Sequence, residues 1–179
     1  MGALALAATG SVAQADGPGE GLVNGGFENG DTGWSAWGGA VIWHTGAYGA
    51  GGTSGVAELG GHTADHDEVV QQTFVLPPYC SGRLSFAMRS DFVPSYGFRE
   101  LTVRVSDFTG QNHQLGYYTN KSQSQTYETL NLALPDSMRR PAPHAVTLSF
   151  VVNDWDNNTE PFLIDDVQLR CPVFIRPRK

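Results

Sequence analysis

Positive charge is scarce in this sequence. Only 11 Lys and Arg side chains stand against 18 Asp and Glu, for a net charge of −7. The one basic cluster is the closing run Arg176-Pro177-Arg178-Lys179, which is too short to form a phosphate-binding groove. We therefore expect no nucleic-acid surface. The basic tail, residues 172–179, is either a frayed end or a contact with a cell envelope.

Long apolar stretches are missing too, and with them any expected transmembrane segment, which takes about 20 residues. The N-terminus has a shorter apolar run, 3–8, followed by the small-x-small sequence Ala13-Gln14-Ala15. This pattern is typical of a secretory signal peptide over residues 1–15. Its basic start is absent, so either the leader is truncated or the start is misplaced. A disordered Ala-rich tail is the alternative. With a signal, the mature chain begins near Asp16 and is secreted.

The sequence has only two cysteines, Cys80 and Cys171. They can form one disulfide in an oxidising compartment, closing a loop on the order of 90 residues. No CxxC pair and no neighbouring histidine accompany them, so zinc binding by cysteine is not expected.

A sustained 3.6-residue apolar period, the mark of an amphipathic helix, is also absent. Glycine is abundant at 22 residues, and short segments alternate between apolar and polar residues. This pattern predicts an all-β, jelly-roll β-sandwich of about ten short antiparallel strands, one domain over 22–171 behind a Gly/Pro linker at 16–21. The expected extended segments are 22–28, 34–37, 40–44, 56–59, 70–76, 84–88, 101–106, 114–119, 127–134, 146–152 and 162–169.

The last segment places carboxylates within an apolar strand. Alternation predicts two faces, one with Leu163, Asp165, Val167 and Leu169 and the other with Phe162, Ile164, Asp166 and Gln168. Either face puts one carboxylate among large apolar side chains, where it requires a hydrogen bond, an opposite charge or a cation. Calcium is the natural cation in a secreted protein. A solvated acidic strand end is the alternative.

Five motifs follow one another along the chain. They are LVNGGFENGDTGW at 22–34, SGVAEL at 54–59, QQTFVLPP at 71–78, LSFAMR at 84–89 and FLIDDVQL at 162–169. Their order resembles galactose-binding-like jelly rolls, particularly carbohydrate-binding modules of families four, nine and twenty-two. That superfamily includes sugar binders, adhesion modules and modules with an architectural role.

In those modules a structural calcium ion lies between the first and last strands. The resemblance implies side-chain ligands from Glu28 and from Asp165 or Asp166, with carbonyls near Asn24 and Gly26. Hard oxygen donors and a close glycine backbone agree with what calcium requires. The ion would hold the chain ends together rather than do chemistry. The alternative is that Glu28 and Asp166 are simply exposed.

A carbohydrate partner, a polysaccharide or an oligosaccharide, would need aromatic faces beside hydrogen-bonding groups. The candidate ligand-binding residues are Trp37, Trp43, Arg89, Tyr118 and Trp155. Trp34 is expected in the core, and Tyr117 and Tyr118 point to opposite faces, so at most one of them is expected in a cleft. Arg89 has a structural ion pair as its alternative.

Trp155 lies in the acidic loop 153–160. That loop is a stacking platform, a second cation site built on Asp154 and Asp156, or a hairpin whose tryptophan folds back over the sandwich edge.

No catalytic signature is present: there is no G-x-S-x-G, P-loop or H-E-x-x-H sequence. His62 and His66 lie in GGHTADHDE, where the glycines favour a loop rather than a metal-binding helix. The sequence therefore predicts a secreted, calcium-stabilised, non-catalytic carbohydrate-binding module. The alternative is a structural or adhesion module of a bacterial cell surface.

Overall fold

The computed structural model describes residues 21–43, 48–61, 67–90, 99–120, 125–154 and 161–171, and this part of the chain is all β. The strands are β1 (Ser35–Trp37), β2 (Val41–Trp43), β3 (Val56–Leu59), β4 (Asp67–Leu76), β5 (Arg83–Ser90), β6 (Arg99–Asp107), β7 (Asn112–Thr119), β8 (Glu128–Ala133), β9 (His144–Asp154) and β10 (Phe162–Arg170). Two short 3-10 turns, η1 (Ala50–Gly52) and η3 (Asp136–Met138), join them. Within these ranges no helix is long and apolar enough to cross a membrane.

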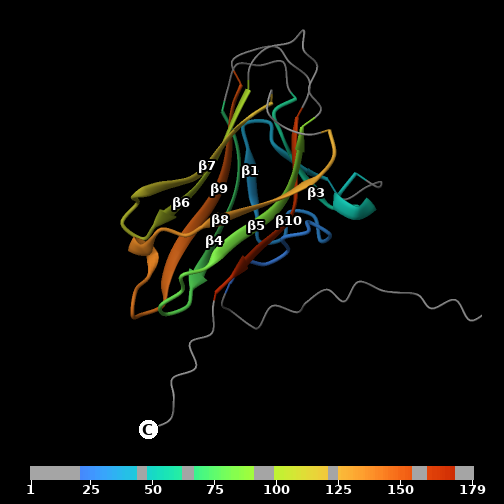
Figure 1. The fold of residues 1–179 in the computed structure, drawn as a ribbon. Helices are drawn as coiled ribbons and strands as arrows, with labels where there is room; N and C mark the ends of the chain where they lie inside the picture. Colours follow the sequence, from blue (N-terminus) through green and yellow to red (C-terminus); the bar gives the residue numbers. More distant parts are fainter. Residues whose placement is uncertain are drawn as a thin grey trace, which may run out of the picture.

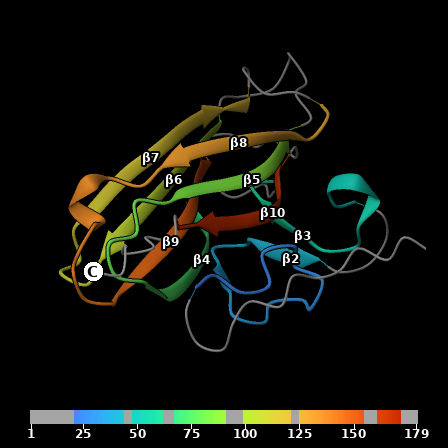
Figure 2. The ribbon, with the colours of Figure 1, turned by 60° about the horizontal axis from the view of Figure 1, so that its bottom comes forward.

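Two five-stranded antiparallel sheets face each other (Figure 1). The first sheet has the order β1-β4-β9-β6-β7 and the second the order β2-β3-β10-β5-β8. Figure 2 shows β8, β5, β10 and β3 of the second sheet following one another, with the first sheet behind them. Strands adjacent in sequence often lie in different sheets, as in a jelly roll. The predicted fold class is confirmed.

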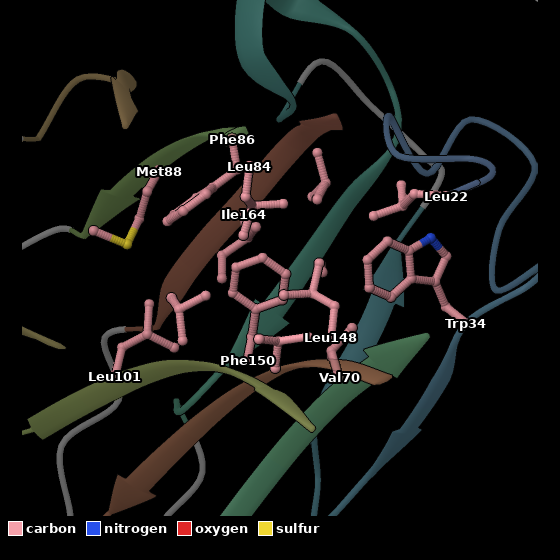
Figure 3. Packing of buried hydrophobic residues seen from close by; sticks show 14 of the residues in the cluster. Leu22, Trp34, Val70, Leu84, Phe86, Met88, Leu101, Leu148, Phe150 and Ile164 are labelled. Atoms are coloured by element: carbon pink, nitrogen blue, oxygen red, sulfur yellow. The ribbon is translucent and has the colours of Figure 1, made fainter. Parts of the chain in front are cut away.

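The core fills the space between the sheets because most strands alternate apolar and polar residues. In β6, for example, Leu101, Val103 and Val105 are buried, while Thr102 and Arg104 between them are only partly buried. Figure 3 shows Phe150 of the first sheet reaching toward Phe86 and Ile164 of the second. The Phe86 and Phe150 rings meet edge to face, with centroids 5.2 Å apart. Each buried ring of this size contributes a few kcal/mol by leaving water.

The segment 22–28, expected as a strand, forms turns instead. Asn24 and Phe27 have φ angles of 49° and 54°, which are incompatible with a β-strand. Gln72 holds the segment, because its side chain accepts a hydrogen bond from Val23 N at 2.7 Å and donates one to Val23 O at 2.9 Å. Trp34 is buried, as predicted, and its indole N–H donates to Asn24 O at 3.0 Å.

The last strand breaks the alternation expected of it. A bulge lies between Asp165 and Gln168, where Asp166 has a φ of 50°. The bulge adds a residue on one side, so side chains after it change face. The core face consequently carries Phe162, Ile164, Val167 and Leu169. The prediction that Ile164 and Val167 lie on opposite faces was wrong.

The predicted disulfide is confirmed. Cys80 and Cys171 are bonded, with Cα atoms 5.1 Å apart and a sequence separation of 91. The bond joins the turn before β5 to the end of β10. The predicted signal segment, the linker up to Glu20 and the basic tail lie outside the described residues.

Candidate functional site

Glu28 reaches from the N-terminal turns to a glycine-rich loop, residues 49–55. Its carboxylate accepts hydrogen bonds from Gly55 N at 2.7 Å and from the Ser54 hydroxyl at 2.8 Å. The approach is close: a side chain at Gly55 would lie 2.2 Å from Gly26 O. Glycine is therefore required at position 55, and the first motif is packed directly against the loop.

Asp165 reaches the same loop from β10. Its carboxylate accepts hydrogen bonds from Ala50 N at 2.7 Å, the Thr53 hydroxyl at 3.0 Å and its neighbour Asp166 N at 2.6 Å. The side chain is fully buried. Burial raises its pKa from 3.8 to about 6, with the Asp166 charge adding to the effect and the hydrogen bonds opposing it.

Oxygen atoms from both ends of the chain converge beside Gly26. A Cβ built on Gly26 would lie 3.8 Å from Asp165 Oδ1 and 3.9 Å from Asp166 Oδ1. Burial and then the Glu28 charge raise the pKa of Asp166. Carboxylates that repel one another, with a glycine carbonyl close by, form a donor set suited to calcium.

This oxygen cluster falls short of a complete ligand shell made of side chains. In the described ranges no three acidic, histidine or cysteine side chains form a ready-made metal cluster, so an ion here would also need backbone oxygens. Asn24 O is already taken by Trp34 Nε1 and Phe27 N. Of the predicted ligands, Gly26, Glu28, Asp165 and Asp166 lie closest together, and the Asn24 carbonyl stays a prediction.

Two exposed aromatic residues lie at opposite edges of the first sheet. One row of paired residues crosses all five strands: Trp37, Val69, Val151, Thr102 and Tyr117. Alternate residues of β4, β9 and β6 fill the core, so this row points outward. We call these five residues the aromatic row.

The shape of the aromatic row follows from its side chains. Trp37 and Tyr117 are each 46% exposed, whereas Val69 and Val151 between them are only 5% exposed. Four strand spacings separate the aromatic residues, about 19 Å. Tyr117 is held by a hydrogen bond from its hydroxyl to the Glu100 carboxylate, which also raises the pKa of Tyr117. Solvent exposure in the row is therefore greatest at its two ends.

Polar side chains flank the aromatic row. The next row across the same face is Ser35, Gln71, Ser149, Arg104 and Gln114. Further along, the hydroxyls of Thr73 and Thr147 are 2.7 Å apart. This face therefore offers amide, hydroxyl and guanidinium groups beside aromatic rings.

Trp43 lies on the opposite side of the molecule, on the outer face of the second sheet. Its indole N–H donates to Glu58 Oε2 at 2.6 Å. Both residues line a hollow of about 410 Å³ together with Tyr48, Val56, Arg89, Pro161 and Leu163. The Arg89 guanidinium lies 5.4 Å from the centre of the Tyr127 ring. The structure thus brings Trp43 and Arg89 together and separates both from Trp37.

Of the other predicted ligand residues, Tyr118 points inward and Trp155 lies outside the described residues. The Tyr118 ring packs edge to face on Phe86 at 6.3 Å, and burial raises its pKa. Tyr117 takes the exposed position that Tyr118 was expected to have. Strand alternation predicts that one of Tyr117 and Tyr118 faces outward, but it does not indicate which one. His62 and His66 also lie outside the described residues, while their neighbour Glu68 is buried and accepts from Gly60 N.

No protein-family model matches this chain, and no curated protein sequence matches it. Solved structures do. A family 61 carbohydrate-binding module in complex with β-1,4-galactotriose has a TM-score of 0.59 at 14% identity, covering 86% of this chain and 99% of that one. The fold is that of carbohydrate-binding modules.

Two further similar structures show the same architecture. A family 16 module matches with a TM-score of 0.51 at 22% identity, over 83% of this chain and 97% of that one. A Clostridium thermocellum xylanase structure, with family 22 and catalytic modules complexed with xylohexaose, has a TM-score of 0.59 at 13% identity. There the match covers 86% of this chain but 29% of the longer one. Some similar structures are thus single modules, and some belong to larger enzymes.

Proposed function

We propose that this protein binds a polysaccharide or oligosaccharide along the aromatic row of the first sheet, without cleaving it. The observation that carries the proposal is the placement of Trp37 and Tyr117 at the two ends of one outward-facing row. Rows of this length fit a chain of several sugars better than a single one. The similar module structures, solved with oligosaccharides, support the same reading.

The chemistry of the row suits carbohydrate. A pyranose presents an apolar face to aromatic rings, while its hydroxyl groups need directed hydrogen bonds. Trp37 and Tyr117 supply the rings, and Gln71 and Arg104 in the neighbouring row supply donors and acceptors. Val69 and Val151, which lie between the rings, are nearly buried, so contact with the sugar chain would fall mainly on the two rings.

Calcium is the proposed structural cofactor. Glu28, Asp165 and Asp166, with the carbonyl of Gly26, would hold it beside the loop 49–55. The ion would offset the repulsion between the Glu28 and Asp166 carboxylates and would join the N-terminal turns to β10. Its ligands would come from the N-terminal turns and from β10 of the second sheet, so the ion would stabilise the fold and take no part in contact with a sugar on the first sheet.

Export from the cell is also part of the proposal. The disulfide between Cys80 and Cys171 is a feature of oxidising compartments. Together with the signal-like sequence at 1–15, it supports a secreted protein.

The decisive experiment compares two tryptophans of similar exposure on opposite faces. Retention on insoluble β-1,4-xylan and β-1,4-galactan, and affinity for their soluble oligomers, are measured for Trp37→Ala and Trp43→Ala. Because the Trp37→Ala variant lacks one stacking contact, its affinity for the sugar chain should be about tenfold lower. Trp43→Ala, the matched control, should bind like the unchanged protein. No reducing ends should appear on long incubation.

Two outcomes would contradict this assignment. Equal binding by Trp37→Ala, with loss of binding by Trp43→Ala, would move the site to the hollow of the second sheet. Failure of the unchanged, correctly folded protein to bind any polysaccharide would favour the structural or adhesion role.

A further inference from the structure

A second hollow, of about 510 Å³, lies on the outer face of the second sheet, away from both Trp43 and the aromatic row. Its lining includes Arg83 and Arg170 together with Ser81, Ser85, Thr129 and Asn131. The volume falls within the range of about 300–1,000 Å³ that small-molecule sites occupy. Its two arginines make it positively charged, in a chain whose net charge is −7.

The two arginines are direct cross-strand partners. Arg170 of β10 pairs with Arg83 of β5, so both side chains point to the same face. Like charges placed opposite each other in this way destabilise a sheet. In an acidic protein with only 11 basic residues, two arginines directly opposite each other are unexpected. An anion bound between the two guanidinium groups would remove the repulsion.

Neither arginine is neutralised by a carboxylate in the described part of the chain. The Arg170 guanidinium donates to Gln168 Oε1 at 3.1 Å, a neutral acceptor. Arg83 is exposed and makes no hydrogen bond or ion pair with a described residue. Both guanidinium groups therefore keep donors for a planar, bidentate acceptor such as a carboxylate.

The other residues that line the hollow fit a sugar acid better than a simple inorganic anion. Ser85 pairs with Asn131 in the row beside the arginines, and Thr129 follows one row further. These neutral hydroxyl and amide groups suit the hydroxyl groups of a pyranose rather than a second charge. The hollow is also larger than a simple anion requires.

We propose that this hollow binds the carboxylate of a uronic acid residue in an acidic polysaccharide. The inference rests on the proposed function only in that the ligand is a carbohydrate. It uses the other sheet, so the protein would contact acidic and neutral chains on opposite faces. The carboxylate of the ligand would bind the two guanidinium groups, and its hydroxyl groups would bind Ser85, Thr129 and Asn131.

The test uses the full chain with two soluble probes, an α-1,4-linked galacturonic acid trisaccharide and neutral β-1,4-galactotriose, measured by titration calorimetry. The uronate should bind, and raising NaCl from about 50 mM to about 500 mM should weaken its binding. Arg83→Gln and Arg170→Gln should each lower uronate affinity about tenfold or more. Arg83→Lys keeps the charge but loses the planar fork, so it should restore only part of that affinity.

The controls separate this site from the aromatic row. Arg139→Gln removes the same charge from an exposed residue outside the hollow and should leave uronate binding unchanged. Trp37→Ala should weaken galactotriose alone. Because Arg83→Gln relieves repulsion, its thermal midpoint without ligand should equal or exceed that of the unchanged protein.

The proposal fails if the unchanged protein does not bind the uronate, or if Arg83→Gln and Arg170→Gln bind it with unchanged affinity. It also fails if inorganic sulfate binds as tightly as the trisaccharide, because the hollow would then be a general anion site. The affinity of Trp37→Ala for galactotriose tests the aromatic row alone, so either proposal can fail without the other.

Discussion

Glu28 and Asp165, from opposite ends of the chain, both bind the loop 49–55. Glu28 accepts from Gly55 N and Asp165 from Ala50 N, each at 2.7 Å. A third contact completes the junction, because Val167 N donates to Gly25 O at 2.9 Å. The two ends of the domain are thus joined through one loop, so a change at this junction should affect stability.

Removal of calcium should destabilise the protein. If the ion binds only the folded state, EDTA should lower the thermal midpoint by roughly 4–8 °C, which corresponds to a loss of about 2 kcal/mol in a domain of this size. Readdition of calcium should restore it. Glu28→Gln and Asp166→Asn should have lower midpoints that no longer respond to EDTA.

Asp136→Asn, an exposed substitution on η3, is the matched control and should keep the full response. An identical midpoint with and without EDTA in the unchanged protein would count against the ion.

The side chain of Gln72 should contribute strongly to stability, whereas that of its neighbour Gln71 should not. Gln72→Ala leaves both the N–H and the carbonyl of Val23 without their partner, which should cost about 2–3 kcal/mol of unfolding free energy. Gln71 points outward, so Gln71→Ala should change stability by less than about 0.5 kcal/mol. Denaturant unfolding of the two variants gives the comparison. Equal effects would mean that the N-terminal turns do not depend on Gln72.

Acid should lower the stability of the folded protein by protonating Asp107, which lies at the turn between β6 and β7. The Thr109 hydroxyl lowers the pKa of Asp107, helped by the backbone of Thr109 and Gln111 and by Arg140. The folded state therefore holds fewer protons than the unfolded chain, and this contribution, present above pH of about 4, is lost as the pH drops through the lowered value.

The measurement is the difference in thermal midpoint between the unchanged protein and Asp107→Asn across pH. That difference should shrink toward low pH. A constant difference from pH of about 6 down to about 2 would rule out the Asp107 contribution.

The disulfide should contribute much of the stability. In the chain-entropy model a loop of about 90 residues is worth roughly 4–5 kcal/mol. The double variant Cys80→Ser/Cys171→Ser should lower the midpoint accordingly while keeping the β-sheet circular dichroism spectrum. Mass analysis without reductant should show the two cysteines joined, and free thiols in the secreted protein would contradict the proposed export.

Much of the fold could be predicted because strand periodicity is local. The segments 56–59, 84–88 and 162–169 each appear as strands within a few residues of the predicted bounds. Pairing of Cys80 with Cys171 followed from their being the only two cysteines. The segment 22–28 failed because the positive φ angles of Asn24 and Phe27 depend on contacts with β4 and Trp34.

The sequence by itself determined that the chain is an all-β sandwich with acidic residues near both ends of the domain, because apolar alternation and turn residues act over a few positions. Only the tertiary structure decided which face each side chain occupies. The bulge after Asp165, the outward turn of Tyr117 rather than Tyr118, and the pairing of Arg83 with Arg170 all depend on register between strands far apart in sequence. A shift of one residue in register exchanges the two faces of a strand, and no local pattern records it.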